Sequence, residues 1–384
     1  MDDFIATTPF FTSQQRALTQ RVAKFVQTEI ERRAGEDERN ADDALRSYVR
    51  ILAAHGLLHY AVATPGERFD LRAFCIIREM LSYSSALADL AFVMQGLGTY
   101  AISLAATEHV RDFWLERARS GQAIAAFALT EPEAGSDIAA LTTNARREDD
   151  TYVINGRKRF ISNAGVADFY TVFARTGTRE DGRAEISPFI VSARMQGFSV
   201  AERTEMIAPH PIGELEFKEC RVPAEDMIGE QGDGLPLALQ TLDVFRASVG
   251  AAACGMALRA LDESVSYAKS RAQFGKKLAE HQLIQEKLAD MATELDAARL
   301  LVYRAAYLKD AGDERATRQA SEAKLFATEA AFRIIDQAVQ IHGGSGLIRG
   351  EVVERLYRDV RALRIYEGTS EIQKLIIANQ LLKE

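Results

Sequence analysis

The sequence lacks the features that mark several large classes of protein. Its three cysteines, Cys75, Cys220 and Cys254, are odd in number, far apart and in no metal-binding spacing. This pattern argues against a disulfide framework and indicates free thiols in a reducing compartment. The opening residues, MDDFIATTPF, contain neither a cationic segment nor an apolar core. We therefore expect no secretory or transit peptide, and a bacterial cytoplasm is favoured over a mitochondrial matrix.

The sequence has fewer basic than acidic residues. The 47 Lys and Arg residues are outnumbered by 55 Asp and Glu, which gives a net charge of −8. Nucleic acid needs a basic surface, so it is not expected as a main partner, although a local basic pocket can still hold a small phosphorylated ligand. Residues 90–107 carry no charge but include Gln95 and Thr99. They predict a buried helix of a soluble protein and not a membrane span.

Common catalytic signatures are missing as well. The run HGGSG at 342–346 has neither the lysine nor the spacing of a phosphate-binding loop, and alone it is typical of a helix C-cap. No GxGxxG follows a predicted strand, and no serine lies in a nucleophile elbow. His55 and His59 are four residues apart, but Gly56 stands where a zinc protease has its glutamate. We therefore expect no metal site.

The hydrophobic pattern divides the chain into three parts. Residues 12–120 show apolar residues at helical spacing. Residues 123–223 hold short β-rich runs separated by turn-forming pairs such as Asn155-Gly156 and Asp181-Gly182. Helical spacing then returns, with long helices expected at about 236–271, 280–310 and 314–341 and shorter ones at about 350–362 and 370–382.

These patterns predict an α+β, mostly α fold with three domains. We expect an N-terminal all-α domain at 1–120 and a middle β-barrel-like domain at 121–229. A C-terminal antiparallel four-helix bundle is expected at 230–384.

Three short stretches have candidate chemistry, each with a plainer alternative. FALTEPEAGSD (127–137) begins as a strand and breaks into a turn that displays amides and hydroxyls, or is a decorated β-turn. In GRKRFISN, Phe160 and Ser162 are two apart on a strand and so share a face. They can line a flat heteroatom-bearing ring, or be a core residue with a polar neighbour. In SRAQFGKKLAEHQ, Arg271 suits a phosphate, or belongs to a charged helix–turn–helix.

A fourth stretch, RIYEGTSEIQKLI (364–376), places Glu367 in a turn. The glutamate can be a solvated loop acid, a helix cap or a base aimed at a substrate. Ser370 and Gln373 have the spacing of a capping box, so a helix is expected to begin after Gly368. Glu367 is not part of that predicted capping box.

Taken together, these stretches resemble the acyl-CoA dehydrogenase family. The motifs TEPEAGSD, GRKRFISN, RAQFG, HQ, QIHGGSG and YEGTSEIQ occur in the family's order and spacing, and the resemblance covers essentially the whole chain. It implies that the protein binds FAD and oxidises an acyl-CoA thioester to its trans-2-enoyl form. Glu367 matches the family's catalytic base, which removes the α-proton while a hydride leaves the β-carbon for flavin N5. Burial beside a flavin should raise the pKa of this carboxyl toward neutrality.

The resemblance also implies the other site residues. Those matching substrate contacts are Ser136, Asp243, Arg246 and Gly368. Those matching flavin contacts within one subunit are Phe127, Leu129, Thr130, Phe160 and Ser162, with Thr369 and Glu371 beside the base. Those matching contacts to the FAD of a neighbouring subunit are Arg271, Gln273, Phe274, Gln282, Gln340, Gly343 and Gly344. Shared sites imply a homotetramer built as a dimer of dimers, and the family's electron acceptor is an electron-transfer flavoprotein.

Three residues depart from the family's usual pattern. Phe160, Ser162 and Phe127 stand where Trp, Thr and Tyr are common, which bears on flavin tuning more than on flavin binding. Some family members carry the base just before the arginine that matches Arg246, but Phe245 occupies that position here.

The substrate and the electron acceptor leave several alternatives open. Residues 81–107 contain no Lys or Arg, which favours a plain aliphatic or alicyclic acyl chain over a dicarboxylate. Carrier-protein thioesters, an oxygen-using oxidase and a non-catalytic family member stay open. A nitroalkane oxidase-like member is disfavoured because that activity typically uses Asp as its base.

Overall fold

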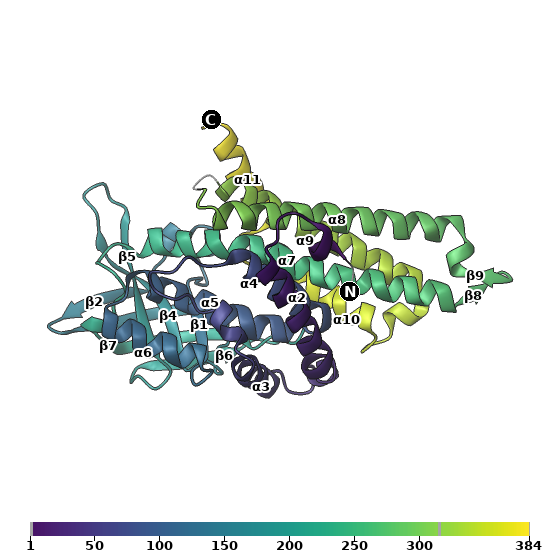
Figure 1. Cartoon of the computed structure of the whole chain (residues 1–384). Coiled ribbons are helices and arrows are strands. Elements are labelled where there is room, and N and C mark those ends of the chain that lie inside the picture. Colours follow the sequence, from purple (N-terminus) through teal and green to yellow (C-terminus); the bar gives the residue numbers. More distant parts are fainter. Residues whose placement is uncertain (1–2, 314–315, 384) are drawn as a thin grey trace. The chain divides into compact units, whose positions relative to one another are not determined.

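The computed structural model describes residues 3–313 and 316–383, and Figure 1 labels its helices and strands. The chain forms two compact units. The helical unit comprises Met1–Glu38, Asp70–Asp89 and Asp243–Glu384, and the sheet unit comprises Arg39–Phe69 and Leu90–Leu242. Each unit is discontinuous in sequence, and the three predicted domain boundaries stay a prediction.

Helices build almost all of the helical unit (Figure 1). The predicted C-terminal helices are confirmed to within a few residues, and residues 314–315 of the predicted third helix lie outside the described residues. In chain order the helices are α1 (Phe4–Thr7), α2 (Ser13–Phe25), η1 (Val26–Ile30), η2 (Ala34–Glu36), α4 (Leu71–Ser84), η6 (Leu278–Glu280), α8 (Gln282–Asp310), α9 (Ala316–His342), η7 (Gly343–Leu347), α10 (Val352–Val360), η8 (Arg361–Arg364) and α11 (Ser370–Leu381). A hairpin of β8 (Ala272–Gln273) and β9 (Lys276–Lys277) precedes η6. Two more helices, α5 (Ala86–Ala105) and α7 (Gly234–Ser270), have residues in both units.

Small residues let the long helices of this unit approach one another. Ala320, Ala327 and Ala331 of α9, which packs on α8, are all buried and are spaced by four or seven residues, so they share one face of the helix. Where α7 meets α4, a Cβ added to Gly255 would lie 2.0 Å from the carbonyl oxygen of Glu79. Glycine is therefore required at this crossing, because any side chain would force the two helices apart.

A buried ionic cluster joins α4 to α8. The Nε of Arg299 donates to Glu79 Oε1 (2.7 Å), and the hydroxyl of Tyr303 donates to Glu79 Oε2 (2.7 Å). The side chains of Glu79 and Arg299 are 5% and 2% exposed. A buried charge that loses its partner is costly, so this cluster makes the packing of α4 on α8 sensitive to its charges.

We predict that Glu79→Gln lowers the free energy of unfolding by about 3–5 kcal/mol, because it removes the carboxylate charge that the buried Arg299 contacts. Urea unfolding followed by circular dichroism measures this loss. The matched control is Glu294→Gln, which removes the partner of the half-exposed Arg333 and should leave the transition almost unchanged. Equal effects of the two substitutions would contradict the role given to the buried cluster.

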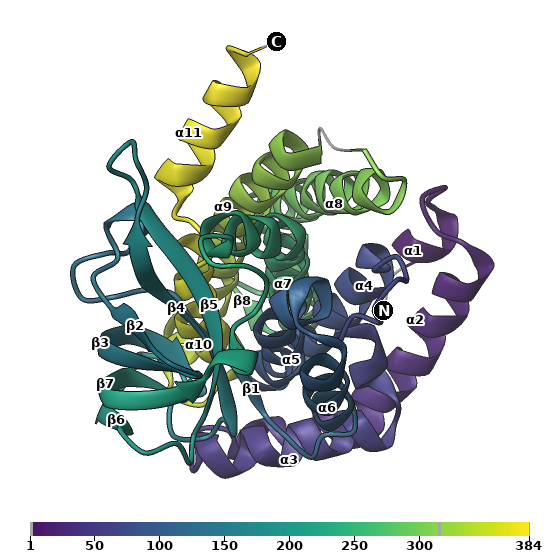
Figure 2. The same cartoon turned by 90° about the vertical axis from the view of Figure 1, so that its left-hand side faces the viewer.

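The sheet unit is built on a curled seven-stranded sheet, which Figure 2 shows. The strand order is β1-β4-β2-β3-β7-β6, and β5 pairs with β4. The strands are β1 (Ala125–Ala128), β2 (Asn144–Glu148), β3 (Thr151–Ser162), β4 (Phe169–Thr178), β5 (Ala184–Ser192), β6 (Phe198–Arg203) and β7 (Ile212–Pro223). The remaining elements of this unit are α3 (Ala41–Ala54), η3 (Leu57–Tyr60), α6 (Glu108–Arg119), η4 (Ile138–Ala140) and η5 (Ala224–Asp226). The predicted mostly α fold, with helices before and after a β region, is confirmed.

A hydrophobic core joins helices of the sheet unit to its strands. Ala101 and Ile102 of α5, Leu115 of α6 and Phe169 of β4 are all buried in one cluster. The ring of Trp114 packs on that of Phe169 with centroids 4.4 Å apart. Ala125, the first residue of β1, belongs to the same cluster, so this core also holds the strand that precedes the TEPEAGSD loop.

One predicted turn is wrong and another is confirmed. Asp181-Gly182 forms the turn between β4 and β5, with Gly182 at φ 82°. Asn155-Gly156 instead lies inside β3, where the register with β7 shifts and Gly156 packs so closely that a Cβ would lie 2.6 Å from the Thr143 hydroxyl oxygen. An Asn-Gly pair suits a bulge as well as a turn, and the close contact with Thr143, just before β2, selects the bulge.

The prediction that Phe160 and Ser162 share a face of a regular strand is wrong. The register of β3 shifts between Lys158 and Ile161, and Phe160 has a left-handed φ of 54°. Regular alternation of side chains is therefore interrupted between these two residues. Their placement follows from the bulge and not from the strand period.

Two helices in the described part of the chain, α5 and α7, are long and apolar enough to span a membrane by length and composition alone. In each, 83% of the apolar window is buried inside the protein. This degree of burial is typical of core helices, as the sequence predicted for residues 90–107.

Candidate active site

Glu367 lies in a strained turn between η8 and α11. Its φ is 53° and that of Gly368 is 93°, both in the left-handed region. The buried side chain of Gln373 holds the turn, because its Nε2 donates to the carbonyl oxygens of Glu367 (3.2 Å) and Gly368 (3.0 Å). Glycine is favoured after Glu367 because side chains rarely adopt a φ of 93°, and a Cβ there would also lie 2.5 Å from that Nε2.

The predicted capping box at the start of α11 is wrong. The N-cap is Thr369, whose hydroxyl accepts a hydrogen bond from the backbone N–H of Ile372 (3.3 Å). The Ser370 hydroxyl is engaged elsewhere, since it donates to Glu329 Oε1 (2.5 Å). The Gln373 amide binds the preceding turn, so neither predicted partner is available to the cap.

Glu329 of α9 anchors the chain on both sides of the turn. Its carboxylate accepts the hydroxyl of Ser370 after Glu367 and the guanidinium of Arg364 before it (2.7 Å). The strained conformation of Glu367 therefore persists because side chains from the helical unit hold the residues around it.

Three buried cations act on the carboxylate of Glu367. They are Arg78 of α4, Lys324 of α9 and Arg246 of α7, which are 1%, 0% and 6% exposed. The Oε2 atom of Glu367 is buried and has no hydrogen-bond partner among the described residues. Burial raises the pKa of Glu367, and the three cations oppose this rise while Asp89 adds to it. The net pKa lies above the ordinary value of 4.5, as expected for a base that works near neutral pH.

Arg78 connects this cluster to the residue before the base. Its Nε and Nη2 donate to the two carboxylate oxygens of Asp89 (2.8 and 2.7 Å), and its Nη1 donates to the Ser248 hydroxyl (2.8 Å). Arg78 also hydrogen-bonds the side chain of Tyr366. Burial raises the pKa of the Tyr366 hydroxyl, which therefore stays protonated.

The two predicted coenzyme A contacts on α7 lie against each other. Arg246 Nη1 is 3.4 Å from Asp243 Oδ1 and 3.3 Å from the Ser321 hydroxyl. Asp243 also accepts from Lys309 and from the Thr317 hydroxyl (3.1 Å). The Nε of Arg246 is buried without a partner among the described residues. This orphaned donor is compatible with a ligand contact, and the assignment to coenzyme A stays a prediction.

In the sheet unit, the structure brings the TEPEAGSD loop against β3. The backbone N–H of Arg159 donates to the Thr130 carbonyl (2.9 Å), so Thr130 lies beside the strand that bears Phe160 and Ser162. Phe160 is 52% exposed, although its ring is large and apolar. An exposed apolar ring on a strand that also carries Ser162 and lies against Thr130 is a candidate surface for a flat, heteroatom-bearing ligand.

A buried ion pair holds that loop in place. Lys158 Nζ donates to Glu131 Oε1 (2.8 Å) and to the Leu129 carbonyl (3.0 Å). Burial would raise the pKa of Glu131, but Lys158 and hydrogen bonds from Thr143 and Thr142 lower it to about 2. The loop is therefore tied to β3 by a pair that stays ionised at neutral pH.

The remaining predicted residues of this region differ in exposure. Phe127 and Leu129 are 9% and 7% exposed, and the Phe127 ring lies 5.0 Å from that of Phe173. Ser136 is exposed in the loop after β1. The structure thus groups Thr130, Phe160 and Ser162, whereas Ser136 has no described contact with them.

His210 touches this group and was not found from the sequence. Its Nε2 lies 2.8 Å from the Ser162 hydroxyl oxygen. Burial lowers the pKa of His210 to about 4, so the ring is neutral at pH 7. The hydroxyl of Ser162 is therefore oriented by a neutral imidazole.

This burial predicts a loss of stability in acid. The native pKa of His210 is below its ordinary value of 6.5, so the unfolded chain binds the proton more readily. The free energy of unfolding should therefore fall as the pH is lowered from about 6.5 toward 4, and His210→Asn should remove part of that fall. Urea unfolding at pH 7.5 and pH 5 measures the difference, with His59→Asn at an exposed position as the control. An unchanged pH dependence in His210→Asn would contradict the assignment.

The residues predicted to contact a neighbouring subunit's FAD lie at one end of the helical unit. The ring of Tyr267, near the end of α7, stacks on His342 at the end of α9 with centroids 4.3 Å apart. Phe274 in the adjoining hairpin is 94% exposed with φ 54°. All seven predicted residues are exposed: Arg271, Gln273, Phe274, Gln282, Gln340, Gly343 and Gly344. Thr369 is partly buried and Glu371 is exposed beside the base turn.

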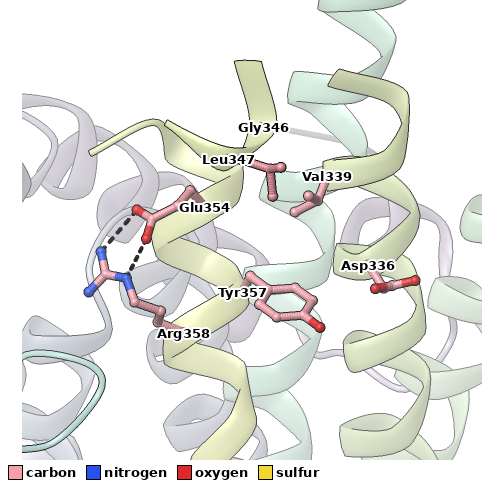
Figure 3. Close-up of a pocket in the computed structure, with 7 residues that line it drawn as sticks. All are labelled: Asp336, Val339, Gly346, Leu347, Glu354, Tyr357 and Arg358. Atoms are coloured by element: carbon pink, nitrogen blue, oxygen red, sulfur yellow. Dashed lines mark hydrogen bonds and ion pairs between the residues drawn. The ribbon is translucent and has the colours of Figure 1, made fainter. Parts of the chain in front are cut away.

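A hollow of about 410 Å³ lies elsewhere in the helical unit, between α9, η7 and α10. Figure 3 shows its lining, in which Tyr357 and Leu347 lie near an ion pair of Glu354 with Arg358. None of the predicted site residues lines it. We therefore do not assign the chemistry to this hollow.

The sequence holds a weak signal for two site residues that it did not predict, Lys324 and Arg78. Lys324 occupies an apolar position of α9, four residues after Ala320 and three before Ala327. Arg78 is likewise flanked by the buried residues Ile77 and Leu81. A lysine or arginine in a buried stripe signals a functional or structural charge. Within the described residues there is no group of three or more His, Cys, Asp or Glu that could hold a metal ion.

Comparison with known proteins adds to this geometry. Three family models match: "Acyl-CoA dehydrogenase, N-terminal domain" at residues 12–122, the corresponding middle domain at 126–220 and the C-terminal domain at 232–382. A 3-(aryl)acrylate reductase of Clostridium sporogenes is 41% identical over 97% of this chain and 100% of its own length. The caffeyl-CoA reductase-Etf complex subunit CarC of Acetobacterium woodii is 35% identical over 98% and 100%. The solved structure of butyryl-CoA dehydrogenase from Megasphaera elsdenii has a TM-score of 0.89 and 33% identity, and covers 97% of this chain and 99% of its own.

Proposed function

Because the chain belongs to the acyl-CoA dehydrogenase family of FAD-dependent oxidoreductases, we propose that it interconverts an acyl-CoA and its trans-2-enoyl-CoA with Glu367 as the base. The observation that carries this proposal is the state of the Glu367 carboxyl. It is held in a strained turn, its Oε2 is buried without a partner among the described residues, and its pKa is raised.

The residues present fit a flavin. Phe160 is half-exposed, and the Arg159 N–H bond to the Thr130 carbonyl holds Thr130 against the strand that bears Phe160 and Ser162. The hydroxyls of Thr130 and Ser162 suit the heteroatoms of a flat ring system. We propose that Phe127, Leu129, Thr130, Phe160, Ser162, Thr369 and Glu371 hold the FAD of their own subunit. When bound, FAD accepts the hydride that leaves the β-carbon of the thioester.

Side chains of the protein itself remove the α-proton of the thioester. An α-proton of a thioester is weakly acidic, so a positioned, ionised base is needed. Glu367 takes this proton on its carboxylate, and Gly368 lets the thioester arm approach because it has no side chain. Asp243 and Arg246 are proposed to bind the coenzyme A portion, together with Ser136. In the opposite direction, protonated Glu367 returns the proton to the α-carbon.

The partners are also proposals. An electron-transfer flavoprotein is supported by the Acetobacterium woodii relative, which is named as part of an Etf complex. We also propose a homotetramer with shared FAD sites, in which the 94% exposed ring of Phe274 is available for contact with another subunit. A cytoplasmic location is supported by the bacterial sources of the relatives.

The base is tested by Glu367→Gln. We expect the variant to keep yellow, bound FAD and to bind acyl-CoA, because the side chain keeps its size. Anaerobic flavin bleaching should slow by roughly 10²–10⁴-fold, the usual worth of a general base. The control is Glu36→Gln, which changes an exposed carboxylate of the helical unit that belongs to no proposed site. Normal bleaching by Glu367→Gln would show that the base is another residue.

The substrate class is tested by an anaerobic bleaching screen. We expect butyryl- to octanoyl-CoA or an alicyclic acyl-CoA to reduce the flavin faster than glutaryl-CoA, because residues 81–107 supply no cation for a second carboxylate. Aryl-acrylyl thioesters added to the reduced enzyme test the reductase direction that the names of two relatives suggest. Preferential turnover of glutaryl-CoA would overturn the expectation.

A further inference from the structure

Lys324 is a buried charge that the proposed function leaves unused. It lies in the middle of α9 and is 0% exposed. Its Nζ donates to the carbonyl oxygen of Gly368 (2.7 Å), the residue that follows the base. A lysine buried this completely costs free energy unless its charge is needed, so its position in the site calls for a specific role.

The three cations near the base are not equivalent. Arg78 forms a two-pronged ion pair with Asp89, and Arg246 lies 3.4 Å from Asp243. Among the described residues, no carboxylate oxygen lies within 4 Å of Lys324 Nζ. The charge of Lys324 is therefore the least neutralised of the three, and Glu367 is the largest attractive charge acting on it.

Lys324 also completes the support of the base turn. The Gly368 carbonyl accepts from both Lys324 Nζ and Gln373 Nε2, and Gln373 also binds the Glu367 carbonyl. The turn holds two consecutive left-handed residues. One ammonium group thus both holds the strained backbone and carries a positive charge that attracts the Glu367 carboxylate.

We propose that Lys324 is a positioning residue for the reaction: its ammonium group holds the Glu367-Gly368 turn through the Gly368 carbonyl and keeps the Glu367 carboxylate ionised at the pH of catalysis. The inference rests on the proposed role of Glu367 as the base. It concerns a residue that never needs to touch the substrate or the flavin.

The charges around Glu367 determine in which direction its pKa should move when the charge of Lys324 is removed. Burial raises the pKa of Glu367, and the attraction of Arg78, Lys324 and Arg246 limits the rise. Removing the Lys324 charge must therefore raise this pKa further and leave less ionised base at neutral pH.

The pKa of Lys324 itself sets the highest pH at which the lysine can supply its positive charge. Burial lowers the pKa of Lys324 to about 8, with Arg246 lowering it further and Glu367, Glu329 and Glu371 opposing that fall. At pH 7 the lysine is still mostly protonated, so it supplies its charge where the base needs it.

The experiment titrates Glu367 directly by infrared spectroscopy of the flavin-loaded protein. The protonated carboxyl band of Glu367 is isolated by subtracting the spectrum of Glu367→Gln made in the same background. We expect the midpoint pH of this band to rise by roughly one unit or more in Lys324→Met and Lys324→Gln, since a nearby opposite charge shifts a carboxyl pKa by that order. Lys324→Arg, which keeps the charge, should stay closer to wild type, and Lys24→Met at an exposed position should not change the midpoint.

Equal midpoints in wild type, Lys324→Met and Lys324→Gln would overturn the proposal, and so would an equal shift in Lys24→Met. If Lys324→Met does not fold, the comparison of Lys324→Gln with Lys324→Arg decides, because both side chains can still donate to the Gly368 carbonyl. The titration uses no substrate. If no acyl-CoA bleaches the wild-type flavin, the proposed function fails while the infrared result still tests the role of Lys324.

Discussion

The balance between burial and charge at Glu367 is the constraint on which the rest of the site depends. A carboxyl shielded from water tends to take up a proton, and a protonated carboxyl cannot act as a base. Three buried cations on α4, α7 and α9 act against that tendency. The helical unit therefore contributes more than a scaffold, because the long helices bring these charges together from positions far apart in sequence.

The same helices stabilise a backbone conformation that the turn would not keep alone. Glu367 is left-handed, which costs of order 1–3 kcal/mol for a residue with a side chain. Gln373, Lys324 and Glu329 hold the residues on either side. In the sheet unit the Glu131–Lys158 ion pair likewise holds the Thr130 loop against β3. In both places a buried, charge-bearing contact holds a short loop that carries the proposed chemistry.

The sequence predicted what depends on local pattern. The C-terminal helices, the β region and the Asp181-Gly182 turn follow from periodicity and turn residues, and the structure has them. The predictions from the sequence failed where a contact with another segment of the chain determines the local structure. Asn155-Gly156 forms a bulge because β3 passes close to Thr143, and Ser370 does not cap α11 because Glu329 takes its hydroxyl. Lys324 and His210 went unnoticed because a single sequence does not show which helix face or loop becomes buried. The roles of the site residues follow from the family's motifs and stay predictions.

The most direct measurement of the central claim follows the α-proton itself. The flavin-loaded protein is incubated anaerobically with butyryl- or octanoyl-CoA in deuterium oxide, and the recovered thioester is analysed by mass spectrometry. The account predicts that deuterium enters the α-carbon with the wild-type protein and that Glu367→Gln abolishes this exchange. Equal exchange by the two proteins would show that another group removes the proton, and the account of Glu367 would be wrong.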